Sequence, residues 1–171
     1  ASPAKSRHTL TCTETPSHFI LRAGEEWTAR LDRSTGQLHE LECRGSPLVL
    51  RGPRLELFRA PTDNDGIKLW DGQEHKPLGT WRRLGLAHLQ QRSRLHRSRQ
   101  SDNAFEFITR TEASGRDRWS DAVALERIAF NSNGEIRLEF DVRFGSADMI
   151  DLPRVGLSLR LPKELRHVRW F

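Results

Sequence analysis

Residues 135–144 constrain the fold more than any other stretch of this chain, because apolar and charged side chains alternate there without a break. The charged residues alternate with the apolar residues Ile136, Leu138, Phe140, Val142 and Phe144. A strict period of two is typical of a β-strand that packs one face on a core and exposes the other to water. Asn133 and Gly134 precede this strand and are a strong signal for a two-residue turn. The pattern predicts an antiparallel hairpin of residues 123–130 and 135–144.

Further short stretches of period two occur along the chain, bounded by glycine, proline or short polar residues. They cover residues 19–31 with a hairpin connection at 32–36, and then 37–43, 48–50, 55–57, 104–111 and 155–161, with a turn at 45–47. The alternation in 86–99 is weak, and a last strand is expected to start at His167. Only residues 76–85 favour a helix, because Pro77 suits its first position and Gly85 the position past its end. About ten short strands and one short helix predict an all-β fold, an antiparallel β-sandwich.

The length of 171 residues suits one domain with a sizeable core. Residues 1–18 are polar and predict a linker or a loosely attached first strand, and residues 19–171 are expected to form the β-sandwich domain. The chain begins at Ala1 rather than methionine and stops within an apolar stretch at 168–171. We therefore expect a piece of a larger protein, with a domain that is incomplete at its C-terminus and leaves a sheet edge exposed.

Composition excludes several classes of protein. No run of about 18 apolar residues and no charged-then-apolar leader occurs, so we expect no membrane partner and a cytoplasmic location. The two cysteines, Cys12 and Cys43, are too few for a disulfide scaffold and lack a C-x-x-C spacing. The seven histidines form no pair with the spacing of metal ligands.

A basic stretch covers residues 82–99, where arginines and histidines occur without any acidic residue. Such a stretch can bind phosphates, because the planar guanidinium matches their geometry. Binding of a single-stranded nucleic acid also needs interleaved aromatic residues, and none lies between Trp81 and Phe105. We expect instead a solvated strand face, or a surface that docks on an acidic neighbouring domain, and no nucleic-acid partner.

A shaped polar loop is predicted at residues 59–66, where the alternation stops. Pro61 fixes its own φ and favours extended backbone at Ala60, and Gly66 accepts a positive φ. Three short side chains between them can accept hydrogen bonds from nearby amides: Asp63, Asn64 and Asp65. The same oxygens suit a hard cation, but the ligand spacing of a calcium loop is missing. We interpret the segment as a structural turn and predict no metal site.

The same loop resembles a known protein family. Its sequence is Phe58-Arg59-Ala60-Pro61-Thr62-Asp63-Asn64-Asp65-Gly66. This segment resembles the signature that opens the C-terminal all-β domain, the small-chain domain, of family 2 glycoside hydrolase β-galactosidases. The flanks agree at residues 35–38, 52–57, 85–86 and 152–156 and at Trp81, so the resemblance covers roughly residues 19–171.

The resemblance implies a supersandwich similar to galactose mutarotase, of which this chain holds the first part. It also implies a parent β-galactosidase, a retaining hydrolase that removes terminal non-reducing β-D-galactose residues from β-D-galactosides. In the family, the catalytic glutamates and the ligands of Mg and Na belong mainly to a preceding (β/α)8 barrel. We therefore expect no catalytic residue and no cofactor in this chain, and an isolated chain without activity. The implied partners are that barrel, β-galactoside sugars and further copies in a homo-oligomer.

The resemblance also carries over four site residues, which are expected to bind substrate or to contact the barrel: Arg59, Asp63, Asn64 and Asp65. The residues alone predict no complete active site, because the carboxylates of this loop lack the apolar surroundings that an acid catalyst needs. Trp70 and Trp119 lie in polar loops, and each is a candidate to stack on a sugar ring or to contact another domain. The alternative hypothesis is a free-standing carbohydrate-binding β-sandwich module.

Overall fold

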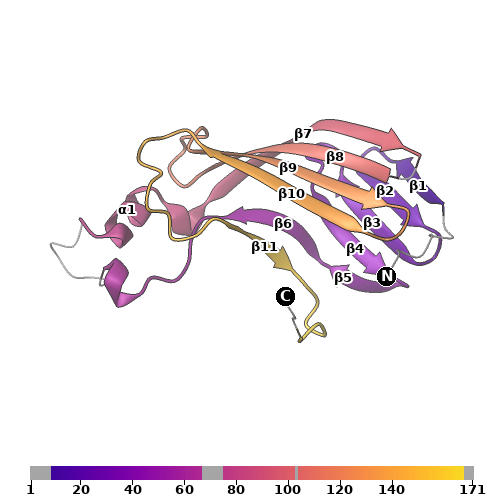
Figure 1. Cartoon of the computed structure of the whole chain (residues 1–171), viewed down its shortest axis with the longest axis horizontal. Helices are drawn as coiled ribbons and strands as arrows, with labels where there is room; N and C mark the ends of the chain where they lie inside the picture. Colours follow the sequence, from indigo (N-terminus) through magenta and orange to yellow (C-terminus); the bar gives the residue numbers. More distant parts are fainter. Residues whose placement is uncertain (1–8, 67–74, 103, 168–171) are drawn as a thin grey trace.

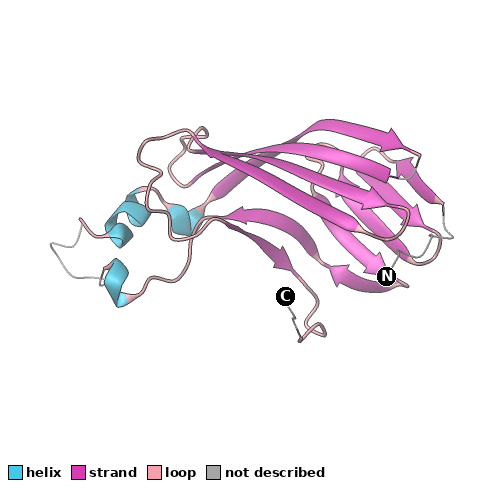
Figure 2. Cartoon of the chain, in the orientation of Figure 1, coloured by secondary structure: helices cyan, strands magenta, loops and turns pink. Residues whose placement is uncertain are grey.

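The computed structural model describes residues 9–66, 75–102 and 104–167 of the chain, and these residues form mainly antiparallel β-structure (Figures 1 and 2). The strands are β1 Leu10–Glu14, β2 His18–Ala23, β3 Trp27–Asp32, β4 Leu38–Cys43, β5 Ser46–Val49, β6 Arg51–Glu56, β7 Gln90–Ser101, β8 Ala104–Ser114, β9 Ala122–Asn131, β10 Ile136–Phe144 and β11 Gly156–Arg160. The helical segments are the 3₁₀ turns η1 Asp63–Asp65 and η2 Leu86–His88 and the α-helix α1 Pro77–Arg83. The predicted all-β antiparallel sandwich is confirmed.

The strands form three sheets. One has five strands in the order β1-β2-β3-β4-β5, a second has four in the order β10-β9-β8-β7, and β6 pairs with β11 alone. The four-stranded sheet lies over the five-stranded sheet (Figure 1). The three helical segments gather at the other end of the molecule, cyan in Figure 2. The loop 59–66 lies at this helical end.

The hairpin of β9 and β10 confirms the prediction from the alternating pattern, but its turn differs from the prediction. The backbone amide of Asn131 donates to the carbonyl oxygen of Glu135, so the loop contains the three residues 132–134 rather than two. Gly134 has φ +84°, whereas Asn133 has no positive φ. A two-residue type I′ turn requires both residues at positive φ, so the chain uses a type I turn followed by a left-handed glycine.

The turn between β4 and β5 lies earlier than predicted. Cys43 pairs with Ser46, so Arg44 and Gly45 form the connection, both with positive φ. This is the geometry of a type I′ hairpin, which matches the twist of the flanking strands. Ser46 therefore belongs to β5 and not to the turn.

Two strands form where the pattern was weak. One is β1, Leu10–Glu14, which pairs along its whole length with β2. It lies within residues 1–18, for which the sequence predicted either a linker or a loosely attached first strand. β7 is the longest strand in the described part of the chain, although its residues hardly alternate. β7 forms the edge of its sheet, and most of its side chains are exposed. It can therefore form a strand without alternating apolar residues.

The predicted helix is confirmed as α1, with Pro77 at its first position and Gly85 in the left-handed conformation just beyond it. Gly85 packs directly on the backbone of Gly115, since a Cβ added to Gly85 would lie 2.2 Å from the carbonyl oxygen of Gly115. This contact joins the helical end to the loop after β8. Within the described residues, no helix has the length and apolar character that a membrane span requires.

The first hydrophobic core lies between the two large sheets. Its buried residues come from β2, β3 and β4 on one side and from β8 and β9 on the other: Phe19, Leu21, Ala29, Leu31, Leu38, Leu41, Phe105, Phe107, Ile128 and Phe130. The alternating residues of β2 and β3 supply one wall, as their pattern predicts. Phe107 contacts both Phe19 and Phe130 in tilted or edge-to-face geometry.

A second core supports the helical end. It contains Leu55, Leu57, Leu78, Trp81, Leu84, Leu86, Ala113, Ala122 and Met149. Its members come from β6, α1, η2, the ends of β8 and β9 and the connecting loops, so this core holds α1 and the loop 59–66 against the sandwich.

Hydrogen-bonded polar side chains on the inner face of β7 and β8 reach across to the 32–36 hairpin and its flank. Gln37 donates to the hydroxyl of Ser93, which bonds to the hydroxyl of Thr111, each at 2.8 Å. Thr109 is buried and donates to the carbonyl oxygen of Thr35 at 2.8 Å. The predicted hairpin at 32–36 thus contacts the opposite sheet through polar groups.

The rim formed by β11 is apolar and open. Its leucines alternate as the pattern predicts, yet Leu157 and Leu159 are 42% and 49% exposed. Leu138, on the apolar side of β10, is 37% exposed. The described part of the chain therefore leaves exposed apolar side chains on β10 and β11, and the expected last strand from His167 lies outside the described residues except for its first residue.

Candidate functional site

The loop 59–66 is organised by an ion pair between Arg59 and Asp65. Two guanidinium nitrogens of Arg59 donate to the two carboxylate oxygens of Asp65, at 2.7 and 3.0 Å. The side chain of Asp65 is nearly buried, whereas that of Arg59 is 35% exposed. A bidentate pair of this kind is short and directional, so it fixes the path of the loop.

Thr62 completes this arrangement. Its backbone amide and its hydroxyl both donate to the Oδ2 atom of Asp65, at 2.7 and 2.9 Å. The carboxylate thus accepts four hydrogen bonds and closes the single 3₁₀ turn η1. The structure thus shows the predicted turn, in which polar side-chain atoms bind one another and the backbone.

Arg59 also ties the loop to the second core. Its guanidinium carbon lies 5.1 Å from the centre of the Trp81 ring, a cation–π contact. Phe58 packs edge-on against the same ring at 6.4 Å. The indole nitrogen of Trp81 donates to the carbonyl oxygen of Asp151 at 2.8 Å, so Trp81 joins the loop, α1 and the segment before β11.

Asp63 and Asn64 point away from this framework. Both residues are exposed, and neither side chain makes a hydrogen bond or ion pair with any described residue. Of the four predicted loop residues, Arg59 and Asp65 are therefore engaged inside the loop. Asp63 and Asn64 are available for contact with a partner or a ligand.

Electrostatics exclude acid catalysis by Asp65. The hydrogen bonds from Arg59, joined by those from Thr62, hold the pKa of Asp65 well below its usual range. The carboxyl group is therefore ionised at neutral pH, whereas an acid catalyst must carry a proton there. The expectation that this loop holds no acid catalyst is consistent with its geometry.

Trp119 lies in the loop that joins β8 to β9, and no described contact joins it to the loop 59–66. The guanidinium carbon of Arg92 lies 3.5 Å from the centre of the Trp119 ring. One face of the indole is thus covered by protein, and a sugar could stack only on the other face. The second candidate, Trp70, lies outside the described residues.

A charged cluster that sequence reasoning missed holds the Trp119 loop in place. Arg116 donates to both carboxylate oxygens of Asp121, at 2.9 and 3.0 Å, and to Asp148 at 2.9 Å. Asp121 is 2% exposed, and the bonds from Arg116 lower its pKa. Ser114 donates to the same carboxylate and accepts from the Arg116 and Arg118 amides. The cluster fixes the loop through local contacts from Arg116 to Asp121 and a distant contact to Asp148, and no apolar pattern in the sequence indicated it.

Glu126 is a second residue that the sequence pattern did not single out. It lies on the inner face of β9 between Ala124 and Ile128, and it is 2% exposed. Burial raises the pKa of its carboxyl group to about 7, and Oε1 has no hydrogen-bond partner among the described residues. The sequence signal for this buried carboxyl group was a charged residue among apolar neighbours on one strand face. Its burial between the sheets keeps Glu126 out of reach of a sugar.

No described constellation amounts to a metal or catalytic centre. Across residues 9–66, 75–102 and 104–167, no group of three or more His, Cys, Asp or Glu side chains converges in a way that could hold a metal ion. The candidate site is therefore a rigid loop with two exposed polar side chains at the helical end of the sandwich.

Comparison with known proteins agrees with the signature. The family model described as "Beta galactosidase small chain" matches residues 23–171. A β-galactosidase of Psychromonas ingrahamii is 27% identical over 157 residues, covering 87% of this chain and 14% of that protein. A β-galactosidase of Vibrio cholerae is 29% identical over 157 residues, covering 89% of this chain and 15% of that protein. The chain thus spans about one seventh of these relatives' length, and it belongs to the β-galactosidase small-chain family.

Proposed function

We propose that this chain is a non-catalytic β-sandwich domain of a retaining β-galactosidase, which hydrolyses terminal non-reducing β-D-galactose residues in β-D-galactosides. The observation that carries the proposal is the Arg59–Asp65 pair, which rigidly presents Asp63 and Asn64 at the helical end. A surface of this kind suits contact with a neighbouring domain, because its backbone is fixed before binding.

The domain would complete a wall of the active-site region and support contacts with the catalytic barrel or between subunits. Asp63 and Asn64 are the residues assigned to that contact, while Arg59 and Asp65 act as positioning residues. Mg and Na, if the parent enzyme uses them, are assigned to residues outside this chain, as the family resemblance implies.

We expect the chain alone to lack the two carboxyl groups that catalysis needs. A retaining glycosidase needs two carboxyl groups about 5–5.5 Å apart on either side of the scissile bond, one of them protonated. In the described residues, Asp65 is paired as an anion and Glu126 is sealed between the sheets. The isolated domain is therefore expected to be inactive.

The native polypeptide supplies the test. An antibody raised against this chain would be used to capture the protein from the source organism, and its mass and its hydrolysis of o-nitrophenyl β-D-galactoside would be measured. We expect a mass several times 19.7 kDa with galactosidase activity, and no activity for the isolated chain. Captured protein of about 19.7 kDa, or a heavier protein without galactosidase activity, would overturn the proposal.

A further inference from the structure

The outer face of the four-stranded sheet is strongly basic. The strand registers place on this face the arginines Arg92, Arg94, Arg97, Arg99, Arg110, Arg127, Arg137 and Arg143, together with the carboxylates Glu106, Glu112, Glu139 and Asp141. The arginines outnumber the carboxylates, and half of them come from the edge strand β7. The weakly patterned stretch 86–99 therefore contributes a charged surface through the outer face of β7, while Leu86 belongs to the second core.

Ion pairing on this face leaves one part uncompensated. Arg127 contacts Glu106 and Glu139 at 3.5 and 3.3 Å. Four other arginines are also engaged, through Arg137–Glu139, Arg110–Glu112, Arg143–Asp141 and the Arg92–Trp119 contact. By contrast, the side chains of Arg94, Arg97 and Arg99 on β7 form no ion pair or hydrogen bond with any described residue.

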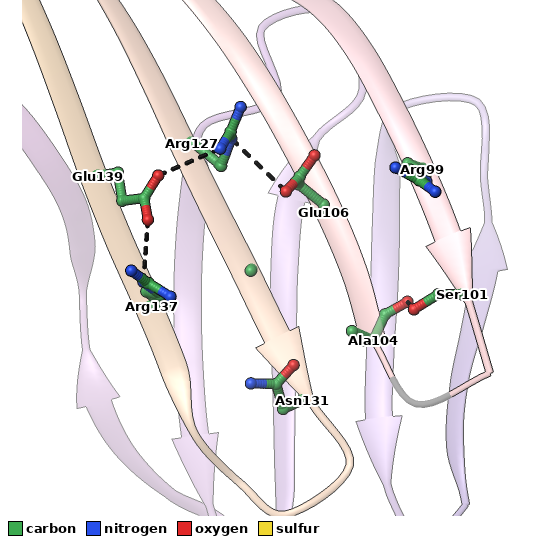
Figure 3. Close-up of a pocket in the computed structure, with 9 residues that line it drawn as sticks. Arg99, Ser101, Ala104, Glu106, Arg127, Asn131, Arg137 and Glu139 are labelled. Atoms are coloured by element: carbon green, nitrogen blue, oxygen red, sulfur yellow. Dashed lines mark hydrogen bonds and ion pairs between the residues drawn. The ribbon is translucent and has the colours of Figure 1, made fainter.

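A hollow shown in Figure 3 is lined by Arg99, one of these three arginines. It has a volume of about 390 Å³, and the small side chains of Ala104 and Ala129 are among its lining residues. The ion pairs that join Glu106, Arg127 and Glu139 line one side, and Arg99 stands apart from them. The hollow can accept a carboxylate side chain that approaches Arg99.

Two apolar side chains lie among the charged residues of the same face. Ile108 and Leu125 lie diagonally opposite one another on β8 and β9, and Leu125 is 39% exposed. Apolar side chains next to a row of arginines suit a surface that binds another protein, because arginine is enriched at such surfaces. The face thus combines the two features that recognise a folded partner with acidic residues around an apolar contact.

Other modes of binding fit less well. Strand addition along the whole of β7 is blocked, because the backbone amide of Leu95 already donates to the carbonyl oxygen of Ser34 at 2.8 Å. A nucleic acid would meet the interspersed carboxylates and would find no aromatic side chain among the outer-face residues of these strands. The mixed pattern of charges fits a protein surface better than a continuous polyanion.

We propose that this face, with Arg94, Arg97 and Arg99 along the edge strand β7 and the contact residue Leu125 two strands away on β9, is a docking surface for an acidic protein surface. The inference does not depend on the galactosidase activity of a parent protein. It assigns the basic stretch to protein recognition, with the carboxylates of the partner bound by the β7 arginines and its apolar residues packed on Leu125.

The test uses the whole chain and a fluorescein-labelled peptide in which glutamates flank a pair of leucines. Binding is followed by fluorescence anisotropy over a range of NaCl concentrations. The triple variant Arg94→Gln/Arg97→Gln/Arg99→Gln should weaken binding by about tenfold and flatten its dependence on salt. Leu125→Gln should weaken binding of this peptide several-fold, but leave binding of a plain glutamate peptide unchanged.

Matched controls distinguish the effect of changing this surface from the effect of lowering the net charge of the chain. Arg22→Gln/Arg51→Gln/Arg160→Gln removes the same charge from exposed positions elsewhere, and Leu161→Gln removes a leucine of similar exposure. These variants should bind within about twofold of the parent chain. Equal losses in both triple variants, no effect of Leu125→Gln, or tighter binding of single-stranded DNA than of the peptide would each overturn the proposal. Circular dichroism would verify that each variant is folded.

Discussion

Arg59 and Asp65, six positions apart, form two parallel hydrogen bonds of 2.7 and 3.0 Å between guanidinium and carboxylate. The pair closes the loop 59–66 on itself and places the guanidinium over Trp81. Two of the most distinctive residues of the signature thus stabilise the loop, and the residues between them are left to face outward.

Asp65→Asn should loosen the loop, because an amide with one oxygen cannot accept two charge-assisted hydrogen bonds from Arg59 and two hydrogen bonds from Thr62. We expect a melting temperature lower by a few degrees and faster proteolysis at 59–66. Asp63→Asn is the matched control and should change neither, since Asp63 is exposed and unpaired among the described residues. Identical behaviour of the two variants would contradict the assigned role of Asp65.

The same ion pair has a defined dependence on pH. The folded-state pKa of Asp65 is lowered by Arg59, so the pair contributes fully above the unfolded-state value of about 3.8. Its contribution is lost as the pH falls below that value towards the folded pKa. Melting curves at pH 6 and pH 3 should therefore differ less for Asp65→Asn than for the parent chain.

Glu126 gives the opposite pH dependence. Below pH 4.5 its carboxyl group is protonated in both states, but between pH 4.5 and about 7 the unfolded state loses its proton first. The free energy of unfolding should therefore fall by about 3 kcal/mol as the pH rises through this range, and then stay constant. Glu126→Gln should remove this loss and stabilise the fold at pH 8 but not at pH 4.

Urea denaturation at the two pH values measures this difference, with the exposed Glu135→Gln as the control. A Glu126→Gln variant that gains nothing at pH 8 would show that the buried carboxyl group has a partner after all.

Gly36 is expected to be intolerant of substitution. It has φ +72°, and an added Cβ would lie 2.5 Å from the hydroxyl of Thr109 and 2.7 Å from Leu95. Gly36→Ala should destabilise the fold by about 2–4 kcal/mol, through backbone strain and overpacking. Gly45→Ala is the control, because Gly45 has φ +75° with no atom within 4 Å, and should cost about 1 kcal/mol. Equal costs, measured by urea denaturation, would argue against the steric contribution.

Arg92 is expected to shield Trp119. Arg92→Ala should increase the quenching of tryptophan fluorescence by acrylamide, because it uncovers one face of the indole. Arg94→Ala, on the same outward side of β7, should leave quenching unchanged. If Arg92→Ala also creates a response to galactose that the parent chain lacks, the covered face of Trp119 is able to stack on sugar.

The apolar rim predicts self-association of the isolated chain. Leu157 and Leu159 are largely exposed on β11, which pairs only with β6 in the described structure. Sedimentation velocity should show association that increases with concentration, and Leu157→Lys should reduce it. A strictly monomeric profile at high concentration would contradict this prediction.

Much of the architecture follows from local pattern. The alternation in β2, β3, β9 and β10 identified these strands, because one face of each packs on a core or its rim and the other meets solvent or a charged surface. Pro77 and Gly85 marked α1 because proline and glycine restrict or permit specific backbone angles regardless of tertiary contacts. The loop 59–66 was recognised for the same reason.

Other features depended on residues that the fold brings together from distant positions. β7 became a strand by pairing with β8, without apolar alternation of its own. The length of the turn at Gly134 followed from the register of β9 on β10. Local sequence contains no information about such partners, since pairing is decided by the whole sheet.

By itself, the sequence determined the β-class of this protein, the position of its helix and the shape of its signature loop, because these depend on side-chain period and on backbone angles allowed to proline and glycine. Only the tertiary structure decided which charges are satisfied. It paired Arg59 with Asp65 and Arg116 with Asp121, left Glu126 buried with an unbonded oxygen, and left the arginines of β7 exposed. Charge satisfaction requires distances across space, and these exist only once the sheets have packed.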